Sequence, residues 1–434
     1  MGTRLRLKRH LLFGLAIVFA AFLVSCAGSR KAQQSIRLTD MYNPGANSIH
    51  PESKVFHLSD SLSELNVAIY PTEVLFNMAN PDSVLQGKVK IIAQLYDVKD
   101  SSVVVDTASA TLVLNQQSLA KKTILTKLPL HAKIGHAYIL NLLVTDVLRE
   151  RTTISLSMVD KLNHNTGQWY RTTLDDGSPF FGISLKPGQS VRVNHPLREL
   201  DSAYVFYYKN LPVAKPPVVA FRVDYPPAAD SVWKWKIAGR GLTLPYSGVY
   251  LVCADSIPGK GVVLGSFNLG FPKIVTNEDL LAPMVYIQPN INDSLLLSAN
   301  KKLLLDSLWL ARAGDHESAR ELIRIYYNRL FLANYFFSSY MEGWKSDRGM
   351  VFMMYGLPNR IFRYGKNEVW VYGTGKGQKL TRFHFVCRQG GASPNDFVLD
   401  YRRSSNLKWS QIQQGWSRGK PFIFDDEDED APDQ

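Results

Sequence analysis

Apolar and polar residues alternate with a period of two along residues 53–175, as expected for β-strands whose two faces meet different surroundings. In TTISLSMV, for example, Ile154, Leu156 and Met158 share one face. Further strand candidates, separated by Asp, Asn, Pro and Gly turns, are KVKIIAQLYDV, SSVVVDTASATLVL and HAYILNLLVTDV. Short strands at a spacing of roughly 8–12 residues predict a β-sandwich over residues 53–175.

Residues 176–292 repeat this pattern and predict a second sandwich. The strand candidates are SVRV, AYVFYYKN, PVVAFRVDY, SVWKWKIA, GVYLVCAD and GVVLGSFNLG. The segment PYSGVYLV resembles the approach to a late strand of Ig-like domains, where a glycine turn and an inward tyrosine fix a corner. We therefore expect Tyr250 to point inward.

The period becomes helical over residues 293–342. KKLLLDSLWLARAG predicts a first helix that ends at Gly314, and Ser318 with Glu321 fits a capping box for the second. One stripe of this long second helix comprises Leu322, Ile325, Tyr326, Leu330, Ala333 and Phe337. Additional aromatic residues widen the stripe, so we expect the helix to pack on two sides.

Residues 343–411 return to strand-like runs, namely MVFMMYG, EVWVYG, KLTRFHFVCRQ and DFVLDYR. A small sheet with the long helix laid across it would bury both apolar faces. His384 alternates with Phe383 and Phe385, which places it on the outer face of a strand. The predicted fold class is therefore multidomain and mainly β: two Ig-like β-sandwiches, then a helical segment and a small α+β C-terminal domain.

The first 25 residues read as a lipoprotein signal peptide, with four basic residues before one apolar run. Leu23-Val24-Ser25-Cys26 resembles a bacterial lipobox, in which Cys26 receives lipid and becomes the mature N-terminus. A transmembrane anchor and an ordinary cleaved signal are the alternatives. Residues 26–52 lack periodicity and predict a flexible tether. No acidic residue directly follows Cys26, which favours the periplasmic face of the outer membrane over export to the cell surface.

The charge balance limits the partners. The formal net charge is +12, and the body without residues 1–25 and the acidic run 425–430 remains strongly basic. Such a surface suits anionic lipid headgroups, an acidic partner or the acidic run itself, while nucleic acid does not fit an exported lipoprotein. Residues 412–434 predict an acidic disordered tail. Cys253 and Cys387 are too few for a disulfide framework and are expected to be buried thiols, with pairing as the alternative.

No catalytic or cofactor motif emerges from the candidate chemistry. GWSRG, residues 415–419, matches the nucleophile elbow, but no histidine follows Ser417. GTGKGQK, residues 373–379, lacks the Ser or Thr that a phosphate loop places after its lysine, so we interpret it as a hairpin turn. The histidines are scattered and indicate no metal site.

The most unusual stretch is GWKSDRGMVFMMYGLPNRI, residues 343–361. We expect Gly343 to end the long helix in a left-handed cap and Trp344 to fold back onto its aromatic stripe. Ser346 and Asp347 should bond nearby backbone N–H groups, and Arg348 should pair with Asp347 or with helix carbonyls. Gly349 would open a strand at residues 350–355, which Gly356 and Pro358 would then turn around.

These residues resemble the GWxTD-domain family of bacterial envelope proteins, with Ser346 in the threonine position. The matching positions are Gly343, Trp344, Ser346, Asp347, Arg348, Gly349, Gly356, Pro358, Trp370 and Tyr372, with Tyr326, Arg329, Ala333 and Asn334 upstream. The resemblance covers about residues 295–405. The G-x-P and W-x-Y pattern is also similar, more faintly, to the small lipoprotein subunit of the outer-membrane β-barrel assembly machinery. Neither resemblance implies an established reaction.

The sequence thus predicts a non-enzymatic lipoprotein on the periplasmic face of the outer membrane. It would act as a scaffold or accessory subunit of an envelope assembly or secretion complex through protein–protein contacts. Its partners would be the membrane, through Cys26, and other envelope proteins, with no cofactor and no small-molecule substrate identified. Trp344, Asp347 and Arg348 are the expected contact residues, mixed with structural roles. The alternative is a glycan- or peptidoglycan-directed binding module or enzyme in the periplasm.

Overall fold

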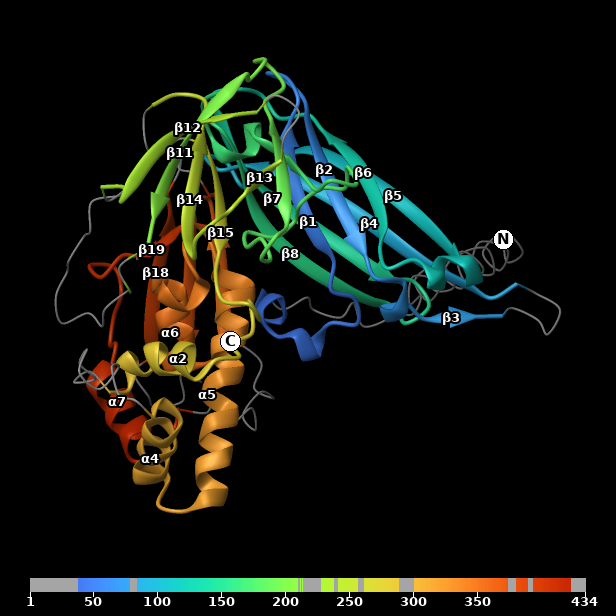
Figure 1. The fold of residues 1–434 in the computed structure, drawn as a ribbon. Coiled ribbons are helices and arrows are strands. Elements are labelled where there is room, and N and C mark those ends of the chain that lie inside the picture. Colours follow the sequence, from blue (N-terminus) through green and yellow to red (C-terminus); the bar gives the residue numbers. More distant parts are fainter. Residues whose placement is uncertain are drawn as a thin grey trace, which may run out of the picture. The chain divides into compact units, whose positions relative to one another are not determined.

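The computed structural model describes residues 38–78, 84–209, 211, 213, 228–237, 241–256, 261–288, 300–373, 380–388 and 393–422. The predictions for the signal peptide, Cys26, the strand PVVAFRVDY, the turn residues 374–379 and the acidic run 425–430 lie outside these residues. Within them the protein is mainly β and multidomain, as predicted (Figure 1). None of its described helices has the length and apolar character needed to cross a bilayer.

Two antiparallel sheets form the first sandwich (Figure 1). One contains β1 (Glu52–His57), β2 (Ser63–Ile69) and β6 (Ile124–Leu130). The other contains β3 (Phe76–Asn77), β4 (Gln86–Asp97), β5 (Val104–Asn115), β7 (His136–Asp146) and β8 (Arg151–Lys161). Alternate residues of both sheets, such as Leu65, Val67, Val89 and Ile91, meet in one core. The period-two pattern arises from this burial, since successive side chains of a strand point to opposite faces.

The apolar face of β8 does not pack into the core of the first sandwich. Ile154, Leu156 and Met158 do share a face, as predicted, but they pack into the hydrophobic cluster of the C-terminal domain. The neighbouring Val159 points the other way, into the core of the sandwich. Strand β8 is therefore covered on both faces and belongs to two cores.

The second sandwich also consists of two antiparallel sheets. One contains β9 (Arg171–Thr173), β10 (Ser190–Asn194) and β13 (Leu242–Thr243). The other contains β11 (Ser202–Tyr208), β12 (Ser231–Lys236), β14 (Gly248–Cys253) and β15 (Val262–Ser266). Three described 3-10 turns connect strands: η3 (Pro71–Glu73) and η4 (Gln116–Ala120) lie within the first sandwich, and η5 (Gly167–Trp169) lies between β8 and β9.

The inward tyrosine predicted for this sandwich is confirmed. Tyr250 is fully buried, and its hydroxyl accepts a hydrogen bond from the N–H of Tyr246 at 2.8 Å and donates one to the Tyr246 carbonyl at 2.7 Å. This reciprocal pair fixes the bend that precedes β14. Cys253 in β14 and Cys387 in β18 (Thr381–Cys387) are both buried and unpaired, as expected.

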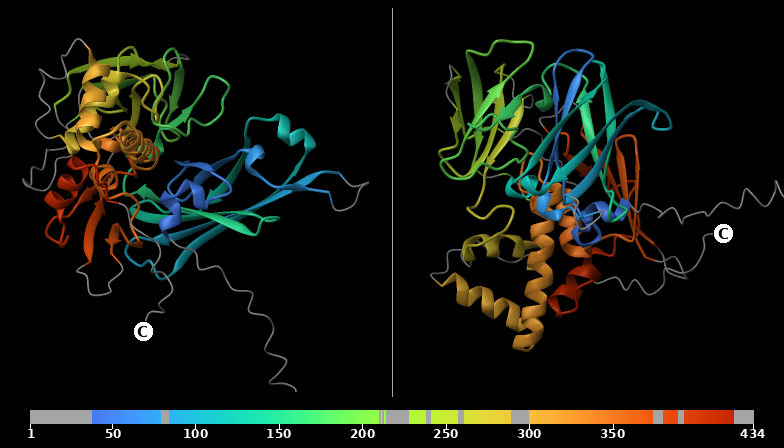
Figure 2. Two further views of the ribbon diagram at one scale, coloured as in Figure 1. Left: turned by 90° about the horizontal axis from the view of Figure 1, so that it is seen from below. Right: turned by 90° about the vertical axis from the view of Figure 1, so that its right-hand side faces the viewer.

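The helical segment contains α2 (Asn277–Leu281), η6 (Ala282–Tyr286), α4 (Lys301–Ala313) and α5 (His316–Phe337). Helices α4 and α5 form a hairpin (Figure 2), and Gly314 between them adopts a φ of +83°, which confirms the predicted stop. The predicted capping box at Ser318 is wrong. Asp315 caps α5 instead, because its carboxylate accepts from the N–H groups of Glu317 and Ser318.

The C-terminal domain contains η7 (Gly343–Lys345), α6 (Asp347–Tyr355), β16 (Arg360–Tyr364), β17 (Asn367–Tyr372), β18, β19 (Phe397–Leu399) and α7 (Trp409–Ser417). The strand expected at residues 350–355 is wrong, because this run lies in helix α6. Every residue from Arg348 to Tyr355 is buried, so the helix shows no amphipathic period, and a short apolar run then looks like a strand. The sheet order is β16-β17-β18-β19.

Two predicted flexible segments are partly ordered. Residues 38–46 of the expected tether form η1 (Leu38–Tyr42) and η2 (Pro44–Ala46), and Met41 and Tyr42 are buried in the C-terminal core. The expected tail begins within α7, where Ile412 and Trp416 are buried. These corrections have one cause, namely that a few apolar side chains in a polar segment suffice to dock it onto a distant core.

Candidate functional site

Two glycines of the GWxTD-like motif allow three backbone segments to touch. A Cβ added at Gly343 would overlap the carbonyl oxygen of Ala333 in α5 and lie 2.6 Å from its carbon. A Cβ added at Gly349 would overlap the carbonyl oxygen of Gly343 and lie 2.7 Å from its carbon. Gly343 is therefore not the left-handed cap that we expected, since α5 ends at Phe337. Both glycines serve close backbone approach, and Gly349 lies in a helix instead of opening a strand.

Trp344 connects this junction to two neighbouring elements. Its side chain is 3% exposed and packs edge-on against Tyr286 of η6. Its N–H donates to Asn334 Oδ1 of α5 at 3.2 Å, and its carbonyl accepts from the Tyr286 hydroxyl at 2.8 Å. The tryptophan is tied to the long helix by its backbone N–H, whereas the aromatic ring that it contacts is Tyr286 of η6 and not the aromatic stripe of α5 that we expected.

Ser346 performs the capping role expected of it. Its hydroxyl donates to the Gly343 carbonyl at 2.7 Å and accepts from the Gly349 N–H at 3.1 Å. Ser346 is the N-cap of α6, and either serine or threonine supplies the hydroxyl that this position requires. The substitution of the family's threonine therefore leaves the geometry intact.

Asp347 accepts a hydrogen bond from a backbone N–H, as expected, but the donor belongs to a strand that is distant in sequence. Its Oδ2 accepts from the N–H of Leu399 in β19 at 2.6 Å, which ties the start of α6 to the edge of the sheet. Burial raises the pKa of Asp347, against the opposing effects of the Leu399 N–H and Arg388. Burial also raises the pKa of the neighbouring Asp396 to about 6, although Arg388 Nη1 lies 3.5 Å from Asp396 Oδ2.

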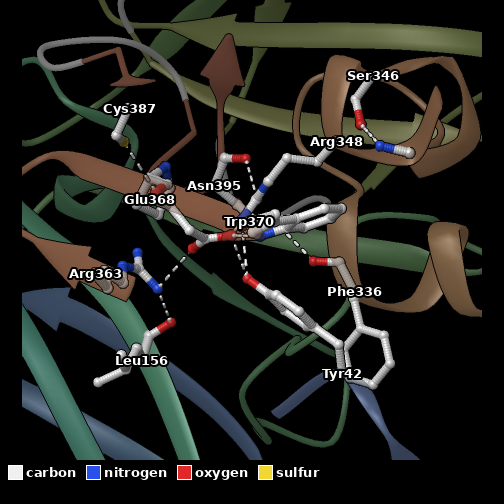
Figure 3. Close-up of polar contacts among 12 residues, drawn as sticks. Tyr42, Leu156, Phe336, Ser346, Arg348, Arg363, Glu368, Trp370, Cys387 and Asn395 are labelled. Atoms are coloured by element: carbon white, nitrogen blue, oxygen red, sulfur yellow. Dashed lines mark hydrogen bonds and ion pairs between the residues drawn. The ribbon is translucent and has the colours of Figure 1, made fainter. Parts of the chain in front are cut away.

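Arg348 lies in a buried ion cluster centred on Glu368 of β17, not against Asp347 or the helix carbonyls (Figure 3). Arg348 Nη1 is 3.5 Å from Glu368 Oε1, and Arg363 Nη1 of β16 is 3.6 Å from Glu368 Oε2. The side chains of the three residues are 3% exposed or less. Burial alone would raise the pKa of Glu368, but Arg348, Arg363 and two hydrogen-bond donors outweigh it and lower the pKa.

The cluster joins parts of the chain that lie far apart in sequence. The Tyr42 hydroxyl of η1 donates to Glu368 Oε1 at 2.9 Å and accepts from Arg348 Nη1 at 3.2 Å. Arg363 Nη1 donates to the Leu156 carbonyl of β8 at 3.0 Å (Figure 3). The N-terminal segment, the first sandwich and the C-terminal sheet thus meet at one carboxylate. We name Tyr42, Arg348, Arg363 and Glu368 the Glu368 cluster.

Further contacts enclose this cluster, in which Glu368 Oε2 has the ion pair with Arg363 but no hydrogen bond from a described residue. Trp370 Nε1 donates to Glu368 Oε1 at 2.8 Å, which gives the W-x-Y tryptophan its polar role. Arg348 Nη2 donates to the carbonyl and to the side-chain oxygen of Asn395, and its guanidinium lies 4.1 Å from the ring centroid of Phe397. A buried carboxylate with this many charge-assisted donors is held rigidly.

The sequence reasoning found Arg348 and Trp370 but missed Tyr42, Arg363, Glu368 and Asn395. A signal was present in two strands. Glu368 shares the parity of the buried Trp370, and Arg363 shares the parity of the buried Ile361. A charge at an inward position predicts a buried partner of opposite sign.

The remaining motif residues fix the turn after α6. The Tyr372 hydroxyl donates to the Gly356 carbonyl at 2.9 Å, and Gly356 adopts a φ of +77° before the buried Pro358. Arg329 of α5 donates to the carbonyls of Met353 and Met354 at 3.3 and 3.1 Å. A cation at a helix C-terminus offsets the partial negative charge there.

The two chemical motifs set aside on sequence grounds have ordinary positions. Ser417 is the last residue of helix α7 and is exposed, so no strand leads into it as a nucleophile elbow requires. Strands β17 and β18 pair antiparallel on either side of residues 374–379, in agreement with a hairpin connection. Among the described residues, no three His, Cys, Asp or Glu side chains are grouped to hold a metal ion.

Replacing Tyr42 with phenylalanine should lower the free energy of unfolding by about 1.5–3 kcal/mol, the range for hydrogen bonds to charged groups. The change removes one hydroxyl from Glu368 and keeps the ring packing against Phe337 and Trp370. Chemical denaturation measures the difference. The matched control is Tyr246→Phe. Tyr246 is 64% exposed, so loss of its hydroxyl should leave the free energy of unfolding unchanged within experimental error. Equal stability of both variants would contradict the role of Tyr42.

The comparisons with known proteins agree with the motif. The model of the GWxTD domain matches residues 248–418, so the matched region starts at β14 and ends just after α7. It is longer than the predicted resemblance to residues 295–405. No curated protein sequence matches the chain. The fainter resemblance to the small lipoprotein subunit of the β-barrel assembly machinery stays a prediction.

Solved structures give only a distant likeness. Bacteroides uniformis β-glucuronidase 2, covalently bound to cyclophellitol-6-carboxylate aziridine, is 10% identical over 32% of this chain and 15% of that chain, with a TM-score of 0.17. A crystal structure of Bacteroides uniformis β-glucuronidase is 9% identical over 34% and 17%, also with a TM-score of 0.17. The chain spans less than a fifth of either, and such a likeness carries no argument. By its family match and its motif geometry, the region of residues 248–418 is a GWxTD domain.

Proposed function

We propose that this protein is a lipid-anchored scaffold or accessory subunit of an envelope assembly or secretion complex, held on the periplasmic face of the outer membrane through Cys26. The observation that carries the proposal is the Glu368 cluster. The motif residue Arg348 contacts Tyr42 of the N-terminal segment, and Arg363 bonds the first sandwich. Trp344 and Asp347 join elements within the GWxTD domain. A motif used in this way suits a rigid adapter, whose exposed surfaces remain available for partners.

The docked N-terminal segment sharpens the proposed geometry. Because Met41 and Tyr42 are buried in the C-terminal core, the tether after Cys26 shortens to residues 27–37. Such a tether reaches at most about 40 Å. The GWxTD domain would then work close to the membrane, where membrane-embedded partners are accessible.

The competing hypothesis is a glycan-directed enzyme or binding module. It would gain support if Asp347 and Arg348 converged with a histidine in a hollow. Instead, Asp347 bonds a backbone N–H and Arg348 faces Glu368. A hollow near α7 is lined by Gln411, Ile412, Gly415, Lys420, Pro421 and Phe422, which include neither motif residue. We therefore favour the scaffold.

Replacing Cys26 with alanine tests the anchor. The variant should move from the membrane fraction to the soluble fraction, since acyl chains on this cysteine supply about 0.8 kcal/mol per buried CH₂. Ser29→Ala, three residues beyond, is the matched control and should stay with the membrane. Fractionation and the mass of the N-terminal peptide measure the outcome. Retention of the unmodified alanine variant on the membrane would contradict lipidation at Cys26.

The scaffold role has its own test. Cross-linking of the native envelope followed by mass spectrometry should recover defined envelope proteins joined to exposed residues of the GWxTD domain. The same treatment of the Cys26→Ala variant should lose those partners, because the protein leaves the membrane. Recovery of no specific partner from the anchored protein would count against the scaffold.

A further inference from the structure

The GWxTD sheet has a face that the motif does not use. Phe383 and Phe385 of β18 are buried in the C-terminal core, while Arg382 and His384 point the opposite way, as predicted for His384. On the edge strand β16, Phe362 and Tyr364 are 49% and 46% exposed on this same outer side. Exposed aromatic residues on an edge strand indicate a contact surface.

Basic side chains surround these aromatic residues. In the strand register, Arg360 of β16 and Arg382 of β18 both lie beside Val371 of β17. Two arginines separated by one strand are about 10 Å apart. Among the described residues, neither arginine has a carboxylate within ion-pair distance. Their positive charge is therefore not neutralised by the described part of the chain.

The turn after β19 extends the basic surface. Arg382 exchanges backbone hydrogen bonds with Ser405, which brings the turn containing Arg402 and Arg403 beside β18. Arg403 Nε lies 3.4 Å from Asp400 Oδ2, so this arginine is already paired. Burial lowers the pKa of His384, Arg403 and Arg382 lower it further, and Asp400 only partly opposes them. We name Arg360, Arg382, Arg402, Phe362 and Tyr364 the outer basic face.

The described chain ends close to the strand end that carries this face. The carbonyl of Phe422 accepts from Arg329 Nη2 at 2.5 Å, and its ring lies 6.3 Å from that of Tyr372. Tyr372 is the last residue of β17, and its side chain lies in the core, on the side of the sheet opposite to Arg360 and Arg382. The eight residues from Phe422 to Asp430 span at most about 28 Å. This length lets the acidic run pass around the end of β17 and reach the outer basic face.

We propose that the acidic segment 425–430 binds the outer basic face as an intramolecular ligand and must be displaced before another anionic partner docks there. Arginine and carboxylate form charge-assisted, often bidentate hydrogen bonds, and the outer basic face offers two arginines without an ion pair in the described residues, one on each side of β17. The contact between exposed charges should weaken with salt, because the Debye length falls to about 3 Å at 1 M ionic strength. This inference concerns the GWxTD domain alone and does not depend on the lipid anchor.

The titration of His384 by NMR in the full chain tests the proposal. The key variant carries Asn at positions 425, 426, 428 and 430 and Gln at positions 427 and 429, which neutralises the segment. At low salt its His384 pKa should be lower than in the wild type by about 0.4, the effect of a carboxylate about 7 Å away in water. At 1 M salt, where the Debye length is about 3 Å, the difference should vanish.

Two further variants separate this contact from a general charge effect. Replacing Glu317 and Glu321, exposed acids of α5, with glutamine should leave the His384 pKa unchanged. In a chain with Arg360→Gln and Arg382→Gln, neutralising the segment should no longer change it. An equal His384 pKa with and without the six carboxylates would overturn the proposal. So would a shift of His384 caused by phosphatidylglycerol vesicles but not by the segment, which would make the face a lipid surface.

Discussion

Replacing Glu368 with alanine should lower the free energy of unfolding by about 3–5 kcal/mol, the usual cost of removing one partner of a buried ion pair. The carboxylate stands between Arg348 and Arg363, whose side chains are almost fully buried. Without it, two guanidinium groups face each other in a low-dielectric core. Urea denaturation of wild type and variant measures the loss. The expected loss of stability is large because the buried charges of Arg348 and Arg363 remain without a partner, and not only because two ion pairs are lost.

A matched control separates these contributions. Glu317→Ala removes an exposed carboxylate that is 3.4 Å from Arg320, and its effect should be close to zero. The triple variant Arg348→Met, Arg363→Met and Glu368→Leu removes all three charges and should regain stability relative to Glu368→Ala. A Glu368→Ala loss below about 1 kcal/mol, the level of an exposed pair, would contradict the description of this cluster.

Replacing Gly349 with alanine should cost about 3 kcal/mol or more, the upper range for overpacking. The added Cβ meets the Gly343 carbonyl group and the Cα of Trp344, 2.9 Å away, and both belong to backbone that cannot rotate aside. The better helix propensity of alanine offsets only about 1 kcal/mol of this cost. Loss of cooperative thermal unfolding, or a large drop in the midpoint temperature, is the expected observation.

The control for this substitution is Gly182→Ala. A Cβ at Gly182 comes no closer than 3.5 Å to another atom, so the substitution should be nearly neutral. If Gly349→Ala were as stable as Gly182→Ala, the close approach of α5, η7 and α6 would not depend on these glycines. The motif would then need another explanation than backbone contact.

Much of the fold follows from local patterns. The sequence candidates match β4, β5, β7 and β8 of the first sandwich, five strands of the second and the stop at Gly314, because alternation and glycine caps depend on residues close in sequence. Strands β1, β2 and β6 were not among the candidates. Helix α6 was mistaken for a strand because total burial erases the helical period. The motif glycines were identified by family resemblance, but their role in backbone contact requires knowledge of which helix lies against them.

The Glu368 cluster was less accessible from sequence. Tyr42 and Glu368 are 326 residues apart, and no local pattern pairs a tyrosine in a polar segment with a distant carboxylate. The inward parity of Glu368 and Arg363 signals that partners exist but does not say which. The same applies to β8, whose outward apolar face shows that a cover exists but does not identify the C-terminal domain.

Amide hydrogen exchange in the Tyr42→Phe variant tests most directly whether the motif joins the N-terminal segment to the GWxTD domain. Loss of the hydroxyl should speed exchange both in residues 38–46 and in strand β17, which carries its acceptor Glu368. Exchange in β11 of the second sandwich, which takes no part in the cluster, should stay as in the wild type. Faster exchange confined to residues 38–46, with β17 unchanged, would contradict the joint.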